Sequence, residues 1–474
     1  MTVDPAEPAT STLAHSAELR RELGVRDLVF AQVLMVVGGS WVGTAAKLGA
    51  ANVGYWLLAA SLFFLPHVVV VLFLNRWAPI EGGPYQWAKL AFGPGFGFLV
   101  AFNLWLYAIS LTVNVGLDVV QALAYAFDRL AWMRTDPLVA PIASVAIIAA
   151  LAAEALAGLH FGKRLHNAGG VVRFSVFALL LLTPLVALVL AHPLRAEATH
   201  LEVPTPTLLG VNLLAKMGFG AFCGLEYAAI FAGESRNPAR AFARSVYVGA
   251  PLIVVMFVGG TAAVLAFVAP ADVDLLAPIP QVLGVATAGL GPVSHIASVA
   301  TVLWVLTLIA TGGVGLAGIT RLPMVAGWDG LLPAWFMRLS PRSRVPVNSI
   351  LFVSAVSATL SVLGLTGVEH QEAYQLFLNT GLVCWALTYL VMFAIPILGR
   401  GPGMPRPPVW LRVAAVSGWG MTLLFVVFAV VPIVRVVSAA AFGLKMIGVV
   451  AGANAVGIGL YLVGKRRGAP AAAA

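Results

Sequence analysis

Two glycine-rich stretches lie inside long apolar segments, and their backbone could bind a small molecule. The first is GGSWVGTAAKLGA at 38–50, and the second is GFGAFCGLEYA at 218–228. Glycine weakens a helix, and a bilayer tolerates a broken helix where its freed N–H and C=O groups face a cavity or a ligand. N–H groups that begin a half-helix attract a carboxylate, and carbonyls that end one attract an ammonium group. The two stretches therefore predict a binding site, although spacing such as Gly220 to Gly224 also suits close packing of helices.

Charged side chains accompany both stretches. A charge near the middle of a bilayer is costly and is usually paired or functional. Glu226 could pair with Lys47, carry a proton, contact a cationic substrate, or form a fixed ion pair. Lys47 and Lys216 lie on the outer side of the stretches, where they could attract an acidic substrate, repel a cationic one, or pair with Asp118 or outer-loop acids. We expect His67 to pack with a hydrogen bond rather than to relay protons.

Residue patterns that support catalysis do not stand out in the sequence. There is no HExxH motif, no paired Cys/His set, no Ser/His/Asp arrangement, and no phosphate-binding loop of the type G-x-x-x-x-G-K-[ST]. Both cysteines, Cys223 and Cys384, fall in apolar segments, which favours neither a disulfide nor a metal site. We therefore expect no catalytic residues, no metal and no cofactor.

The composition indicates which elements carry these residues. Hydrophobic residues make up 60% of the chain and charged residues 10%, and the mean hydropathy is +0.96. Soluble domains carry about 25% charged residues, so the chain is predicted to be an all-α membrane protein. We count about twelve apolar segments long enough to span a bilayer. They cover 28–50, 54–75, 95–127, 138–159, 168–191, 207–232, 244–268, 290–320, 347–364, 373–398, 411–433 and 441–463.

The net charge of +9 reflects topology rather than a nucleic-acid partner. Most basic residues fall in alternate connections and at both ends, whereas the other connections carry acids such as Asp272 and Asp274. This positive-inside bias predicts a multi-pass protein of the cytoplasmic (inner) membrane with both termini in the cytoplasm. The bilayer is then the expected environment, and the sequence leaves the oligomeric state open.

Three motifs carry a resemblance to a known superfamily. They are EGGPYQWAKLAFGPGFGFLVAFNLW (81–105), GLEYAAIFAGESRNPARAFARS (224–245) and ITRLPMVAGWDGLLPAWFMRLSPRSRVPVNS (319–349). In this order they resemble signatures of the amino acid–polyamine–organocation (APC) superfamily. The resemblance covers nearly the whole chain.

The resemblance implies a LeuT-type fold of two inverted five-helix repeats plus two C-terminal helices, with helices 1 and 6 broken. The corresponding boundaries are a cytoplasmic tail at 1–26, a first repeat at 27–192, a second at 205–398, helices 11 and 12 at 410–464, and a tail at 465–474. It also implies a secondary active transporter of amino acids or related amines that works by alternating access, as a proton symporter, exchanger or uniporter. A polyamine or other organic-cation transporter and a non-transporting sensor remain alternatives.

The resemblance also implies where substrate binds. In the family, unwound backbone of helices 1 and 6 holds the substrate. Transferred to this chain, these contacts fall on Gly43, Thr44, Ala45, Ala221, Phe222, Cys223 and Gly224. Trp304 is a candidate pocket wall, with core packing as the alternative.

Some positions depart from the family pattern. Ala45 replaces a glycine, and Lys47 stands where an apolar residue is usual. Gly220 occupies a position that often carries a gating aromatic. Its absence predicts either a roomier pocket or a gate supplied by Phe222, Phe219 or Trp41.

Arg173 aligns with a position where some family members carry a lysine, in the region where sodium-coupled relatives of the fold bind sodium. A permanently charged arginine could take the place of that cation without titrating. This argues against sodium coupling at that position and against Arg173 as the proton carrier. The alternative is a side chain that snorkels to the cytoplasmic surface.

Overall fold

The computed structural model describes residue 19 and residues 21–134, 136–189, 194–195, 202–275, 277–288, 294–365, 370–432 and 438–468. Most of the predicted N-terminal tail (1–18 and 20) and the last part of the C-terminal tail (469–474) lie outside the described residues.

Within the described residues the regular structure is helical, and strand-like pairing is limited to two isolated bridges. This confirms the all-α fold class. The elements are α2 (Val25–Val36), α3 (Gly39–Ala46), η1 (Gly49–Ala51), α4 (Asn52–Ala59), η2 (Ala60–Phe64), α5 (Leu65–Trp77), α6 (Pro84–Phe92), α7 (Pro94–Ala126), η3 (Asp128–Arg134), α8 (Val139–Ala157), α9 (Leu159–Val189), α10 (Leu208–Ala215), η5 (Lys216–Ala221), η6 (Leu225–Glu234), α11 (Pro238–Leu265), α12 (Pro278–Thr287), α13 (Ser294–Ile319), α14 (Arg321–Trp328), η8 (Ala334–Met337), α15 (Val347–Leu365), α16 (His370–Leu398), α17 (Val409–Ala429) and α18 (Ala439–Gly468).

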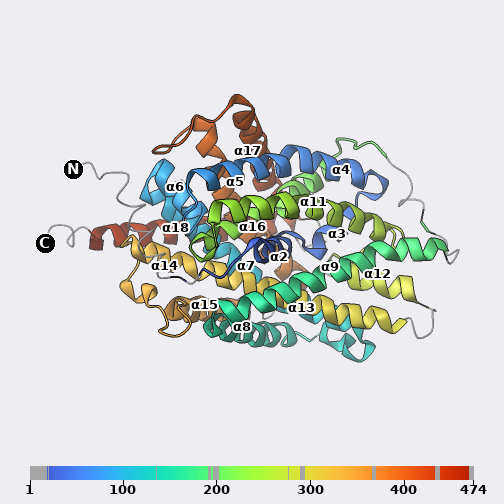
Figure 1. Cartoon of the computed structure of the whole chain (residues 1–474). Coiled ribbons are helices and arrows are strands. Elements are labelled where there is room, and N and C mark those ends of the chain that lie inside the picture. Colours follow the sequence, from blue (N-terminus) through green and yellow to red (C-terminus); the bar gives the residue numbers. More distant parts are fainter. Residues whose placement is uncertain are drawn as a thin grey trace.

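Eleven described helices are long and apolar enough to cross a membrane, and the bent pair α2–α3 makes twelve. This agrees with the predicted number of spans and with a LeuT-type bundle. The long helices run side by side (Figure 1). We call the end that holds α6, α14 and the last turns of α18 the α14 end, and the opposite end, with α12, the α12 end.

The helices differ in how deeply they are buried. The apolar window of the span 208–234 is 78% buried, whereas that of α18 is 11% buried. The first helix is also central, because α2 packs against α9, α11 and α13. The two glycine-rich stretches therefore lie at the centre of the bundle, and α18 lies on its surface.

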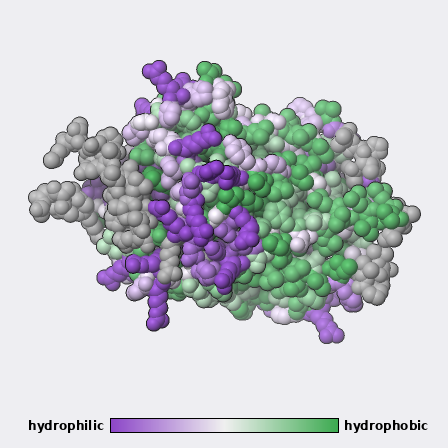
Figure 2. All heavy atoms as spheres, viewed as in Figure 1, coloured by the Kyte–Doolittle hydropathy of each residue, from purple (hydrophilic) through white to green (hydrophobic). Residues whose placement is uncertain are grey.

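Proline and glycine set several helix starts. Proline occupies the first turn of α6, α7, α11 and α12, where its missing N–H costs no helical hydrogen bond. Gly93 precedes α7 with φ +95°, in the region that favours glycine. Figure 2 shows hydrophilic residues gathered toward the α14 end and hydrophobic residues over much of the rest of the visible face.

Candidate functional site

The first helix is broken between α2 and α3. The two half-helices meet at a 44° bend, and the unwound residues are Val37 and Gly38. This confirms a broken first helix and corrects the position of its unwound backbone. Gly43, Thr44 and Ala45, where the resemblance placed it, lie within α3.

Close packing explains the glycine within α3. A Cβ built on Gly43 would lie 3.0 Å from Cβ of Pro278 and 3.2 Å from the carbonyl oxygen of Asp274. The Thr44 hydroxyl donates to the Ser40 carbonyl oxygen at 2.9 Å. Gly43 thus lets α3 approach the start of α12, and a contact of Gly43–Ala45 with substrate stays a prediction.

The sixth helix is interrupted inside the predicted stretch Ala221–Gly224. The π-helical turn η5 ends at Ala221, Cys223 and Gly224 have no helical structure, and the 3₁₀-helix η6 begins at Leu225. Gly224 has φ +117°, which side chains rarely adopt, so a glycine is required at this turn.

The two breaks touch each other. A Cβ on Gly224 would lie 3.2 Å from Cγ2 of Val36 and 3.6 Å from the carbonyl oxygen of Met35. The last turn of α2 therefore lies against the unwound turn of the sixth helix. Half-helix ends from the first and the sixth helix therefore meet at one place in the bundle.

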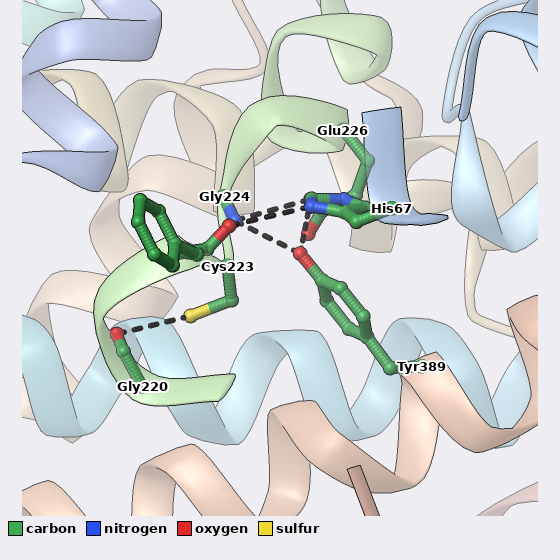
Figure 3. Close-up of polar contacts among 7 residues, drawn as sticks. His67, Gly220, Cys223, Gly224, Glu226 and Tyr389 are labelled. Carbon is green, nitrogen blue, oxygen red and sulfur yellow. Dashed lines mark hydrogen bonds and ion pairs between the residues drawn. The ribbon is translucent and has the colours of Figure 1, made fainter. Parts of the chain in front are cut away.

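A buried acid holds the second break (Figure 3). Glu226 is 0% exposed, and its Oε2 accepts from the Gly224 N–H at 3.2 Å and from the Tyr389 hydroxyl. The same oxygen lies 3.1 Å from Nε2 of His67, whose Nδ1 lies 3.3 Å from the Phe222 carbonyl oxygen. The Gly224 N–H also donates to the Tyr389 oxygen at 2.8 Å. Glu226, His67 and Tyr389 therefore contact the Phe222 carbonyl and the Gly224 N–H, the backbone groups on either side of Cys223.

Two of these partners were not predicted. His67 was expected to pack with a hydrogen bond, which it does, but its contact with Glu226 was not foreseen. Tyr389 was not singled out at all. A tyrosine in an apolar span gives a weak signal, because its ring suits the core and its hydroxyl needs only one partner.

Lys47 does not pair with Glu226. Its Nζ donates to the Ala271 carbonyl oxygen at 3.1 Å, near Asp272 and Asp274. Lys47 therefore lies by the outer loop that carries these acids, with a backbone carbonyl as its hydrogen-bond partner, and its pairing with them stays a prediction.

Lys216 is also buried, and its Nζ donates to the Val431 carbonyl oxygen at 2.6 Å, just beyond the end of α17. A cation at the end of a helix interacts favourably with the free carbonyls there.

A buried cation holds the first break. Arg173, on α9, is 1% exposed, so it does not snorkel to the surface. Its Nη1 donates to the carbonyl oxygens of Leu34 at 3.1 Å and Val37 at 2.5 Å. Its Nη2 donates to the Thr307 carbonyl oxygen and to the hydroxyls of Thr307 and Thr311, at 2.9–3.2 Å. The guanidinium thus ties the end of α2 to α13.

Aromatic side chains cover the breaks. Trp304 lies over Arg173, with the guanidinium carbon 5.0 Å from the ring centroid. A Cβ on Gly39 would lie 2.7 Å from this indole, so Trp304 sits against the start of α3. Trp41 covers Gly220 in the same way, because a Cβ there would lie 2.3 Å from the Trp41 ring. Of the three gate candidates, Trp41 is therefore the one that lies against Gly220.

The other two gate candidates pack into aromatic clusters. The ring of Phe222 stacks on Phe64 at 4.4 Å and meets Phe257 edge-on at 5.4 Å. The ring of Phe219 stacks on Phe425 at 4.7 Å. These contacts place both rings in the core. Cys223 is buried as well, and its thiol lies 3.4 Å from the Gly220 carbonyl oxygen.

A second ionic network, which the sequence did not reveal, closes the α14 end. Glu234, at the end of η6, makes two 2.7 Å contacts with the guanidinium of Arg321, at the start of α14. Glu81 accepts from the Gly233 N–H at 2.5 Å. Burial, together with the nearby Glu234, raises the pKa of Glu81 well above its usual value, although Arg321 opposes the shift.

The N-terminal segment joins the same network. The Leu23 N–H donates to the Glu234 carbonyl oxygen at 3.0 Å, and the Arg236 N–H donates to the Leu23 carbonyl oxygen at 2.9 Å. The segment that leads into α2 is thereby fastened to the end of η6.

A bundle of twelve apolar spans with two broken helices at its centre is the architecture of a multi-pass membrane transporter. Comparison with known proteins gives the family. The family model described as amino acid permease matches residues 23–452, and the chain belongs to this family. This confirms the APC resemblance and the prediction that the protein is a transporter rather than an enzyme.

Several curated proteins are similar over most of their length. An uncharacterized transporter of Mycobacterium tuberculosis is 27% identical, over 95% of this chain and 92% of that protein. The lysine-specific permease LysP of Escherichia coli is 25% identical, over 77% of this chain and 76% of its own. The branched-chain amino acid permease BcaP of Bacillus subtilis is 24% identical, over 87% and 88%.

Proposed function

We propose that this protein is a secondary active transporter that moves amino acids or related amines across the cytoplasmic membrane by alternating access. The observation that carries the proposal is the contact between the two breaks, where Gly224 lies against Val36 and Met35. An α-amino acid suits such a place. Its carboxylate can bind N–H groups at the start of α3 or η6, and its ammonium can bind carbonyls at the end of α2.

The Glu226 cluster supports proton coupling over exchange or uniport. Its carboxylate accepts from the Gly224 N–H, so substrate and carboxylate compete for the same backbone donor. Protonation removes the charge that strengthens this hydrogen bond, and a substrate carboxylate then competes for the donor with the neutral Tyr389 oxygen alone. Arg173, by contrast, keeps its charge at physiological pH, so it acts as a fixed cation and makes sodium unnecessary at the first break.

The distribution of basic residues supports the orientation. Exposed basic residues of the α14 end include Arg338, Arg400, Arg406, Lys465 and Arg466. By the positive-inside rule the α14 end faces the cytoplasm, with both termini on that side.

Uptake into proteoliposomes tests the proposal. The purified full-length protein is assayed with labelled neutral, acidic and basic amino acids and with polyamines, with and without an inward proton gradient, in sodium or choline buffer. We expect uptake of at least one amino acid, stimulated by the gradient and unchanged by sodium. Uptake of polyamines alone would instead assign an organic-cation transporter. Binding without flux would assign a sensor, and neither binding nor flux would refute transport of these substrates.

The relatives suggest which substrates to try first. LysP is named lysine-specific and BcaP branched-chain-specific. The Trp41 ring, from the facing half-helix, occupies the space beside Gly220. A larger or smaller residue at position 41 is therefore expected to change which size of substrate side chain is preferred.

A further inference from the structure

A large apolar cavity lies at the α14 end, away from the two breaks. Its volume is about 840 Å³, within the range of small-molecule sites. Four elements line it: α7, α14 with the segment that follows it, α15 and α18. Aromatic rings dominate the wall, including Phe98, Phe102, Trp105, Phe336 and Phe352.

One side of the cavity faces the lipid. Phe98 and Trp105 lie on one face of α7, and a helix rises about 1.5 Å per residue, so the wall extends roughly 10 Å along this helix. On the other side, Phe352, Leu460 and Val463 are 40%, 46% and 47% exposed. Because α18 is a surface helix, this side opens toward the hydrocarbon of the bilayer.

Exposed cations follow the lining residues closely in the sequence, at the end of η8 and near the end of α18. Lys465 and Arg466 directly follow the lining residues Val463 and Gly464, and both are exposed. Arg338 follows the lining residue Phe336 at the end of η8 and is also exposed. Within the described part of the chain, none of these three cations takes part in an ion pair. The nearby acid, Asp329, is already paired with Lys89 at 2.5 Å.

We propose that this cavity is a binding site for an anionic phospholipid, with an acyl chain along α7 and the phosphate against Arg338, Lys465 and Arg466. The apolar wall fits a hydrocarbon chain, and the cations fit a negative headgroup. Clusters of Lys and Arg next to a membrane span attract anionic lipids, with a gain in affinity of roughly 5-fold for each cation near the surface.

The site has a route to the transport machinery. Leu322, Pro323 and Ala326 of α14 line the cavity, and Arg321 of the same helix holds Glu234 at the end of η6. A lipid in the cavity therefore braces the helix that carries Arg321.

Native mass spectrometry of the purified full-length protein tests the site. The protein is titrated with phosphatidylglycerol, with phosphatidylcholine of the same acyl chains, and with free oleate. We expect one tight phosphatidylglycerol site and weaker binding of the other two lipids. The double variant Lys465→Gln/Arg466→Gln should lose roughly 30-fold in affinity for phosphatidylglycerol and keep its affinity for phosphatidylcholine.

The chain offers a matched control. Arg400→Gln/Arg406→Gln removes the same charge between α16 and α17, where no residue lines the cavity, and should leave phosphatidylglycerol binding unchanged. Ala101→Phe, which fills the cavity, should abolish tight binding of any lipid, with the melting temperature of the purified protein reporting its folding.

Equal affinity for the two phospholipids, an equal loss in both double variants, or oleate binding as tight as phosphatidylglycerol would each overturn the proposal. So would tight phosphatidylglycerol binding by a folded Ala101→Phe variant. These measurements need no transport, so the lipid site and the proposed transport activity stand or fall separately.

Discussion

The two broken helices are held by opposite kinds of charge. At the first break, the Arg173 guanidinium occupies carbonyl oxygens at the end of α2. At the second, the Glu226 carboxylate occupies the Gly224 N–H. A guanidinium stays protonated at every physiological pH, whereas a carboxylate or an imidazole can change its charge. The two breaks lie in contact but differ in the sign of the charge that holds them, and under the proposed proton coupling only the second would respond to pH.

Removing Arg173 should have the largest effect. Arg173→Met leaves the carbonyl oxygens of Leu34 and Val37 and the Thr307 and Thr311 hydroxyls without this donor, at a cost of about 1–3 kcal/mol for each group left unsatisfied. We expect proteoliposome uptake to fall by roughly 100-fold or more at every pH. Arg173→Lys, which keeps the charge but loses the fork of donors, should retain part of the activity. Near-normal uptake by Arg173→Met would show that transport does not depend on a buried cation at the first break.

Glu226→Gln should act differently, because it removes a charge and keeps the shape. Transport should fall roughly 10-fold and, if Glu226 carries the coupled proton as proposed, lose most of its dependence on pH, since an amide cannot take up or release a proton. The measurement is the initial uptake rate across about pH 5–8, the interval in which histidine also titrates. A pH profile parallel to that of the wild type would reduce Glu226 to a structural role.

Tyr389→Phe tests the hydrogen bonds of the second break with a smaller change. The hydroxyl donates to Glu226 and accepts from the Gly224 N–H, whereas the ring packs against Phe63 and Phe219. One or two hydrogen bonds at about 0.5–1.5 kcal/mol each predict a loss of roughly 3- to 10-fold, with a shifted rather than flattened pH profile. His67→Gln is the companion variant, and a shift there but not in Tyr389→Phe would assign the titration to the imidazole.

The smallest expected effect is on stability and comes from Glu81, outside the spans. Because burial raises its pKa, the folded protein favours the neutral acid, and ionisation costs stability as pH rises from the ordinary value of about 4.3 to the raised one. Glu81→Gln should therefore raise the melting temperature of the purified protein by about 1–3 °C at neutral pH. The gain should disappear in acid. A gain that does not vary with pH would mean that the pKa of Glu81 is the same in the folded and the unfolded protein.

For the second break, the sequence predicted which residues are unwound. For the first, it predicted only that the helix is broken. Gly224 is the residue of its stretch with positive φ, and no other residue type suits that turn as well. In the first stretch, Gly38, Gly39 and Gly43 look alike. Their different roles depend on Trp304, which packs on Gly39, and on Pro278, which packs on Gly43. Those neighbours come from distant parts of the chain.

The polar partners of the breaks could not be predicted either, because they too come from distant parts of the chain. His67 and Tyr389 lie 159 and 163 residues from Glu226. The sequence predicted that a charge beside the break would need a partner, because burial is costly, but no local pattern says which helix supplies it. Arg173 was singled out through the family resemblance, and its burial at the first break could be seen only in the structure.

The short backbone pairing of Leu23 with the residues after η6 has a mechanical consequence. It fastens the start of α2 to the end of η6, and the contact of Val36 with Gly224 fastens the other ends of the same two half-helices. Contacts at both ends restrain α2 and η6 from moving independently of each other. We therefore expect α2 and η6 to tilt together as one unit. The surrounding helices should limit the size of this tilt.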